Sequence, residues 1–160
     1  MTFTTASLAL IARTREEALR EVEQMSVDDR RQVAPEWLAK VRGSSGCDPW
    51  LHGFVMTLRG ESKSIGRCGY TGPPGPDGVV EIAYGVDPEY QGKGYATEAA
   101  MGLLGFAFRD PGVRAIRAHT LPQENASTRV LTKCGFRRVG ESIDHEAGVV
   151  WQWEKHRAVA

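Results

Sequence analysis

Cysteine is scarce in this sequence of 160 residues, and the cysteines present form no recognisable pair. They are Cys47, Cys68 and Cys134. An odd number without a C-x-x-C motif disfavours both a disulfide framework and a cysteine-based zinc site. The histidines His52, His145 and His156 also lack a spacing typical of metal ligands. We therefore predict a protein of the reducing cytoplasm that binds no metal.

The chain also lacks an excess of charge and a long hydrophobic run. Twenty basic residues balance twenty acidic ones, so we expect neither nucleic acid nor an anionic membrane as a partner. No apolar run approaches the roughly 20 residues of a membrane helix, and no basic region precedes an apolar one at the N-terminus. We predict a soluble protein, either a monomer or a homodimer.

No linker, repeat or low-complexity segment divides the chain. Its 41% hydrophobic content is sufficient for one core. We therefore predict a single domain that spans residues 1–160.

The most informative stretch runs from Val79 to Phe108 and reads as strand, turn and helix. The apolar run 79–86 has strand length and ends at Asp87-Pro88. From Ala96, apolar and small residues recur at helical spacing until Asp110-Pro111. This order predicts a buried strand that feeds a long helix.

The turn between them, Gln91-Gly92-Lys93-Gly94-Tyr95-Ala96, is suited to hold an anion. Its two glycines allow the backbone N–H groups to converge in front of the helix, and Lys93 adds positive charge. Two nucleotide-binding motifs fit less well. No Ser or Thr follows Lys93 as a phosphate loop requires, and Thr97 replaces the third glycine of the dinucleotide fingerprint.

The residues Q-x-x-G-x-A at 91–96 resemble the cofactor loop of the GNAT superfamily of acyl-CoA-dependent N-acyltransferases. V-D-P-E-Y before the loop, Y-A-T-E-A after it and E-N-A-S-T-R-V-L-T-K-C-G-F downstream are similar to the branch that contains the ribosomal-protein and peptide N-terminal acetyltransferases. The resemblance implies acetyl-CoA as cosubstrate, with its pyrophosphate on Gln91, Gly92, Lys93, Gly94, Tyr95 and Ala96. It also implies that backbone N–H groups near Tyr84, Gly85 and Val86 polarise the thioester carbonyl.

The family implies a mixed α/β fold whose mostly antiparallel sheet has six to seven strands, splays between the fourth and fifth, and is flanked by about four helices. The pattern of residues predicts strands at 7–12, 51–59, 64–70, 79–86, 113–121, 136–143 and 149–153. It predicts helices that begin near Thr14, Ser26 or Asp28, Pro35, Ala96 and Ser127. By resemblance, residues 79–140 bind acetyl-CoA, and residues 1–70 border the acceptor, with Trp37 and Trp50 either lining its site or lying in the core.

In the downstream block, the resemblance implies that Asn125 bonds the pantetheine arm, although its spacing to Ser127 is one residue shorter than usual. The alternative is that Asn125 caps a helix. Leu131 occupies the position at which many members of the family carry a tyrosine acid. The departing thiolate would therefore be protonated by Ser127, by water or by no protein group.

Glu81 resembles the glutamate that related enzymes use as base, often through water, and an acceptor anchor is the other role considered. His119 is a weaker candidate for the base because an unperturbed imidazole titrates near neutral pH, at about 6.5. Glu98 more simply favours the dipole at the start of its helix. The sequence thus predicts direct acetyl transfer to the primary amine of a small molecule or a peptide N-terminus. An acetyl-CoA-binding regulatory module without efficient turnover, and a general nucleotide-binding protein, are the alternatives.

Overall fold

The computed structural model describes residues 1–144 and 147–158. The strands are β1 (Thr2–Thr4), β2 (Leu8–Ala12), β3 (Phe54–Leu58), β4 (Ser64–Tyr70), β5 (Val79–Val86), β6 (Ala115–Thr120), β7 (Arg137–Asp144) and β8 (Gly148–His156). The helices are α1 (Arg15–Gln24), α2 (Val27–Arg31), α3 (Pro35–Arg42), α4 (Tyr95–Phe108), α5 (Ala126–Lys133) and the 3-10 turn η1 (Pro88–Tyr90).

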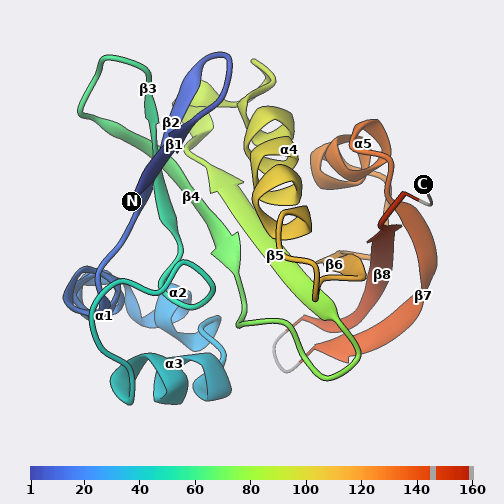
Figure 1. Cartoon of the computed structure of the whole chain (residues 1–160), viewed down its shortest axis with the longest axis horizontal. Helices are drawn as coiled ribbons and strands as arrows, with labels where there is room; N and C mark the ends of the chain where they lie inside the picture. Colours follow the sequence, from blue (N-terminus) through green and yellow to red (C-terminus); the bar gives the residue numbers. More distant parts are fainter. Residues whose placement is uncertain (145–146, 159–160) are drawn as a thin grey trace.

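One sheet with the order β1-β2-β3-β4-β5-β6-β8-β7 runs through the molecule, as Figure 1 shows. All neighbouring strands are antiparallel except β5 and β6, which are parallel. The expected mixed, mostly antiparallel sheet is therefore confirmed. Two of the counts were too low, because the described residues form eight strands and five α-helices.

The strand that the sequence did not predict is β1. It is three residues long, which is too short to produce a readable alternation, and it is held by pairing with β2. With β1 included, the strand at 79–86 is the fifth in the chain. The expected strand at 51–59 begins only at Phe54, because the N–H groups of Leu51 and His52 bond to the carbonyl of Asp48 in a turn.

Local sequence signals account for most helix ends. Thr14 caps α1 in a capping box with Glu17, Ser26 caps α2, and Pro35 opens α3. The expected cap at Ser127 was wrong, because Asn125 caps α5 instead. The final hairpin is formed by β7 and β8, but the expected turn residues His145 and Glu146 lie outside the described residues.

The helices cover both faces of the sheet. On one face α4 packs against β2, β4 and β5, and α5 packs against α4. This face carries the main core, in which Phe54, Leu103 and Ile116 are completely buried. On the other face a smaller core joins α1 to α3 through Ala18 and Val41. Figure 1 shows α1, α2 and α3 together at one end of the molecule, away from α4 and α5. In the described part of the chain, no helix has the length and apolar character needed to cross a bilayer.

The sheet opens between β5 and β6. These strands pair only from Val79 to Glu81 and from Ala115 to Arg117, and β5 then continues to Val86 without β6 beside it. Counted without β1, this is the splay that was expected between the fourth and fifth strands. The splay leaves one edge of β5 exposed toward α5.

Candidate active site

The backbone of β5 presents polar groups to this opening. At one end of the β4–β5 ladder the N–H of Thr71 bonds to the carbonyl of Glu81 at 3.0 Å, and at the other end the N–H of Asp87 bonds to a β4 carbonyl at 2.8 Å. Alternate residues of an antiparallel strand direct their backbone groups to the same side. Residues 81, 83, 85 and 87 therefore bond to β4, and the N–H groups of Tyr84 and Val86 point into the splay.

The turn before α4 has the backbone shape that the sequence predicts. Gly92 and Gly94 have φ angles of +76° and +86°, which residues with a Cβ atom rarely adopt. Within the described residues, none of the N–H groups from Gly92 to Thr97 donates a hydrogen bond inside the chain. The side chain of Gln91 donates to the carbonyl of Val86 at 2.8 Å and ties the turn to the end of β5.

A cavity of about 360 Å³, here called the α5 cavity, lies between this turn, the end of β5 and α5. Its lining includes every residue of the Gln91–Ala96 turn except Lys93, together with Tyr84, Gly85, Val86 and Ser127. Lys93 is exposed and is not part of the lining.

The charges of the α5 cavity come instead from Arg129 and Lys133, the two charged residues in its described lining. The sequence analysis missed both. Their spacing of four residues places them on one face of α5. In the sequence, this spacing and the predicted anion-binding turn were the signals that could have identified the two residues. The α5 cavity therefore combines free N–H groups with two cations, an arrangement suited to phosphate groups.

A second cavity of about 410 Å³, here called the α1 cavity, lies on the opposite side of β5 under α1 and α3. Much of its described lining is apolar and includes Val22, Met25 and Leu51. Trp37 also lines it and donates its indole N–H to the carbonyl of Leu51 at 2.8 Å. Tyr84 and Gly85 line both cavities, so both spaces reach the end of β5 from its two sides.

Trp37 and Trp50, the two tryptophans within residues 1–70, lie in different surroundings. Trp37 lines the α1 cavity, whereas Trp50 is not in its lining. The Trp50 ring packs at 4.7 Å from Tyr70 and 5.4 Å from Phe106, measured between centroids, against the main core. Trp50 therefore lies in the core, whereas Trp37 packs against the smaller core and also lines the α1 cavity, and its place in an acceptor site stays a prediction.

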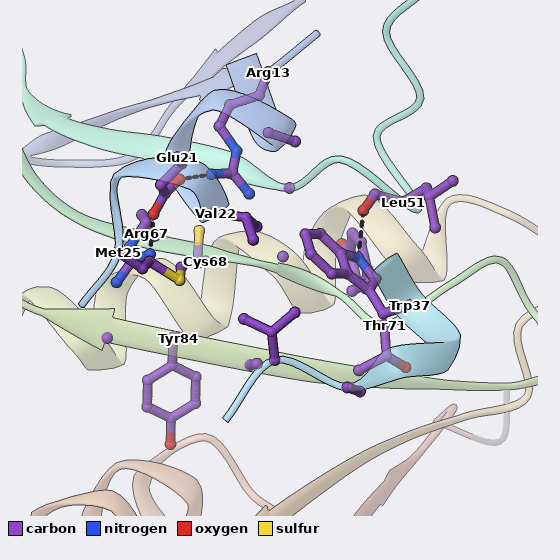
Figure 2. A pocket seen from close by; sticks show the side chains of 18 residues that line it. Arg13, Glu21, Val22, Met25, Trp37, Leu51, Arg67, Cys68, Thr71 and Tyr84 are labelled. Atoms are coloured by element: carbon purple, nitrogen blue, oxygen red, sulfur yellow. Dashed lines mark hydrogen bonds and ion pairs between the residues drawn. The ribbon is translucent and has the colours of Figure 1, made fainter. Parts of the chain in front are cut away.

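Three charged residues of the α1 cavity form a network that no local sequence pattern indicates. Glu21 on α1 pairs with both Arg13 and Arg67, as Figure 2 shows. The Nε of Arg13 also donates to the carbonyl of His52 at 2.8 Å. The three side chains come from separate segments, so only the folded chain brings them together.

Tyr84 connects β5 to α5. Figure 2 shows its ring pointing away from the side chains of the α1 cavity, and its hydroxyl lies 3.1 Å from the Ser127 Oγ. Burial raises the pKa of Tyr84, so its hydroxyl stays protonated at neutral pH. Leu131, which replaces the expected tyrosine acid, is completely buried in the core. Tyr84 and Ser127 therefore place a pair of bonded hydroxyls between β5 and α5.

Asn125 serves as the cap that was considered as the alternative to pantetheine binding. Its Oδ1 accepts a hydrogen bond from the N–H of Thr128 at 3.0 Å, and the Thr128 hydroxyl lies 2.9 Å from the N–H of Asn125. Asn125 is not among the residues that line the α5 cavity.

Glu81 and His119, proposed separately as base, lie side by side. The Nδ1 of His119 is 3.2 Å from the Glu81 Oε1. Hydrogen bonding to Glu81 raises the pKa of His119 against the opposing effect of burial. Neither residue is in the described lining of the α1 or the α5 cavity, but Glu81 pairs through its backbone with Thr71, which lines the α1 cavity. The pair therefore lies just beyond the end of that cavity, at the start of the splay.

Glu98 has a structural role in the described chain. Its carboxylate accepts hydrogen bonds from the Thr5 hydroxyl and the N–H of Ser7, and so joins α4 to the β1–β2 turn. Burial alone would raise the pKa of Glu98, but the hydrogen bonds from Thr5, Ser7 and Leu8 together outweigh this effect and lower the pKa.

Ser44, His52 and Asp48 superficially resemble a nucleophilic triad, with the Ser44 Oγ 2.7 Å from the His52 Nε2. The Ser44 hydroxyl, however, donates to the carbonyl of Val41, and the N–H of Asp48 donates to the His52 Nδ1. The imidazole must then carry its proton on Nε2 and donate to serine, so it cannot act as a base toward it. Among the described residues, no group of three or more His, Cys, Asp or Glu is placed to hold a metal ion.

The sequence matches two bacterial relatives in part. It is 30% identical over 118 residues to the uncharacterised N-acetyltransferase YjdG of Bacillus subtilis. The aligned residues cover 74% of this chain and 65% of that protein. It is 37% identical over 87 residues to the uncharacterised N-acetyltransferase YnaD of the same organism. Here the aligned residues cover 54% of this chain and 51% of that protein. The matches thus span between half and two thirds of these relatives.

The fold is similar to that of a solved structure, the ribosomal L7/L12 α-N-protein acetyltransferase RimL in complex with coenzyme A. The TM-score is 0.72 at 16% identity, over 98% of both chains. The family model described as the acetyltransferase (GNAT) domain matches residues 3–137, a range that includes the splayed strand, the glycine turn and both cavities. By this match, the chain belongs to the GNAT acetyltransferase domain family.

Proposed function

We propose that the protein transfers the acetyl group of acetyl-CoA to a primary amine by direct attack, with both substrates bound together. The observation that carries this proposal is that Tyr84 and Gly85 line two cavities, one on each side of β5. One cavity has the N–H groups and cations that phosphates require, and the other has a larger apolar share in its lining. Two reactants entering from opposite sides would meet at the end of β5.

The residues of the α5 cavity fit acetyl-CoA. The free N–H groups from Gly92 to Thr97 would bind the pyrophosphate, and Arg129 and Lys133 would neutralise its charge. The N–H groups of Tyr84 and Val86, which point into the splay, would hold the pantetheine arm and the thioester oxygen. The names of relatives support an amine as acceptor, since one is an L-2,4-diaminobutyric acid acetyltransferase.

The chemistry requires one proton to leave and another to arrive. The amine nitrogen attacks the thioester carbon, the carbon–sulfur bond breaks, and the nitrogen loses a proton. We assign removal of that proton to Glu81 through water, with His119 holding the carboxylate in place. We assign to Ser127, whose hydroxyl is bonded to that of Tyr84, a hydrogen bond to the departing thiolate, which takes its proton from water. Asn125 is assigned the positioning of α5 through its cap.

A thermal-shift titration with acetyl-CoA, CoA and ATP, combined with an assay of CoA release, tests the proposal. Acetyl-CoA at a hundred times its Kd should stabilise the fold by about 2.7 kcal/mol, and a panel of amines should release CoA. Stabilisation by ATP but not by CoA would reject the proposal. Stabilisation by acetyl-CoA without release of CoA from any amine would favour the regulatory module.

A further inference from the structure

We propose that the acceptor is an α-amino acid with an apolar side chain, whose carboxylate is bound by Arg67. This inference rests on the proposed acetyl transfer and specifies its second substrate. It depends on the charge balance of the α1 cavity, on the position of Arg67 relative to Gly85, which lines both cavities, and on the apolar residues of the α1 cavity.

The charge balance favours an anion. Among the described residues that line the α1 cavity, three are charged: Arg13, Glu21 and Arg67. Glu21 is shared by both arginines, so the network keeps one positive charge. Arg13 is largely buried and also bonded to a backbone carbonyl, whereas the Arg67 side chain is 55% exposed. Arg67 therefore has donors left for a ligand, and a guanidinium matches a carboxylate through two parallel hydrogen bonds.

The same balance argues against a polycationic acceptor such as an aminoglycoside or a polyamine. Such a molecule requires several carboxylates close to its amines. The one carboxylate in the described lining of the α1 cavity is Glu21, which already pairs with two guanidinium groups.

The position of Arg67 places this anion site next to the reacting groups. Arg67 on β4 is the direct cross-strand partner of Gly85 on β5, and direct partners project from the same face with Cβ positions about 5 Å apart. Gly85 lines both cavities. The guanidinium thus begins beside the point at which the thioester carbon would lie.

Glu81 lies on the same face of β5, four residues before Gly85, or about 13 Å along the strand. An amine held between Gly85 and Glu81 therefore has the Arg67 guanidinium on one side and, on the other, a carboxylate that is paired with His119. A zwitterion would lie in this field with its carboxylate toward Arg67 and its amine toward Glu81. A neutral amine without a carboxylate would leave Arg67 without a ligand.

The rest of the cavity provides room for an apolar side chain. Val22, Met25, Trp37 and Leu51 line it, and the indole N–H of Trp37 is already bonded to the carbonyl of Leu51. These four side chains offer no free polar group, so they favour hydrocarbon or aromatic groups, while Thr71 adds one hydroxyl to the lining. Together with Arg67, they define an amino acid such as leucine or phenylalanine as the acceptor.

The test compares L-leucine and L-phenylalanine with their primary amides in an assay of CoA release. The rates are compared per neutral amine, because loss of the carboxylate lowers the pKa of the amine. We expect kcat/KM to be at least tenfold higher for the acids, in line with a charge-assisted hydrogen bond. Arg67→Gln should reduce this preference to near unity. Arg20→Gln, which removes an exposed arginine of α1 outside the cavity, should preserve it.

A binding measurement makes the test independent of turnover. Calorimetry should give at least tenfold tighter binding of N-acetyl-L-leucine than of N-acetyl-L-leucinamide, and Arg67→Gln should equalise the two. The inference would be overturned by any of three results. These are a kcat/KM for the amides that equals or exceeds that for the acids, equal affinity for the two products, or a higher kcat/KM for kanamycin or spermidine. Failure of acetyl-CoA to stabilise the protein would instead overturn the proposed function, so the two failures are distinguishable.

Discussion

At the scale of single residues, the Nδ1 of His119 and the Oε1 of Glu81 are 3.2 Å apart, so a change to one should affect the other. Glu81→Gln should lower kcat/KM by about 10² to 10⁴, the usual contribution of a general base. It should also lower the pKa of His119, because hydrogen bonding to Glu81 is the largest cause that raises it. The pH dependence of activity and an NMR titration of the imidazole measure these two effects.

The direction of the pKa shift defines a pH window for stability. A histidine whose folded pKa is raised stabilises the fold most below the unfolded pKa of about 6.5, and this contribution is lost as the pH rises through the folded pKa. A Glu81→Gln variant that left the His119 titration unchanged would separate the two residues. An unchanged rate at every pH would remove Glu81 from the role of base.

The cations of the α5 cavity allow a second test at this scale. Arg129 lines the cavity, whereas Lys93, the residue that the sequence favoured, does not. Arg129→Gln should therefore raise the KM for acetyl-CoA by about tenfold, as expected for a charged hydrogen bond, and Lys93→Gln should change it less. Initial rates at fixed ionic strength provide the comparison. The reverse order would show that the exposed lysine binds the phosphates.

At the scale of elements, the start of α4 depends on glycine. Gly94 has a φ of +86°, yet a Cβ placed on it would meet nothing within 4 Å. Gly94→Ala should therefore destabilise the fold by about 1–2 kcal/mol through backbone strain alone and raise the KM for acetyl-CoA. Gly105→Ala in the same helix also meets nothing within 4 Å but should stabilise by about 0.5–1 kcal/mol. Urea denaturation of both variants tests the contrast.

The cap of α5 separates the two interpretations of Asn125. If the residue serves only as the cap, Asn125→Ala should destabilise the fold by about 0.5–2 kcal/mol, and Asn125→Asp, which retains an acceptor oxygen, should destabilise it less. The KM for acetyl-CoA should then follow the stability of the variants. A large rise in KM for Asn125→Asp with unchanged stability would indicate contact with the pantetheine arm.

Whether an element could be predicted from the sequence depended on how local its signal is. Strand β5, the glycine turn and α4 were readable because apolar period, turn glycines and helix spacing are local signals. The capping box at Thr14 was readable for the same reason. Strand β1 was not predicted because three residues are too few to show an alternation of apolar and polar residues. The Arg13–Glu21–Arg67 network was not predicted because its members come together only in the folded chain.

At the scale of the whole molecule, the proposed function predicts that both substrates bind before either product leaves, because each has a cavity of its own. Cys68 lines the α1 cavity, but burial raises its pKa to about 12, so it remains a thiol and is a poor nucleophile. Double-reciprocal plots at several fixed concentrations of the second substrate should therefore intersect. Parallel lines, or an acetylated Cys68 found by mass spectrometry, would indicate a covalent intermediate.

The three-residue pairing of β5 with β6 has a consequence for dynamics. Beyond Glu81, one edge of β5 has no partner strand, and the extended pantetheine arm, with its two amide groups, could add to this edge as a surrogate strand. The backbone amides of Tyr84 and Val86 should then exchange with deuterium readily in the free protein and slowly with CoA bound. The coenzyme would in this sense complete the ladder that the polypeptide leaves unfinished.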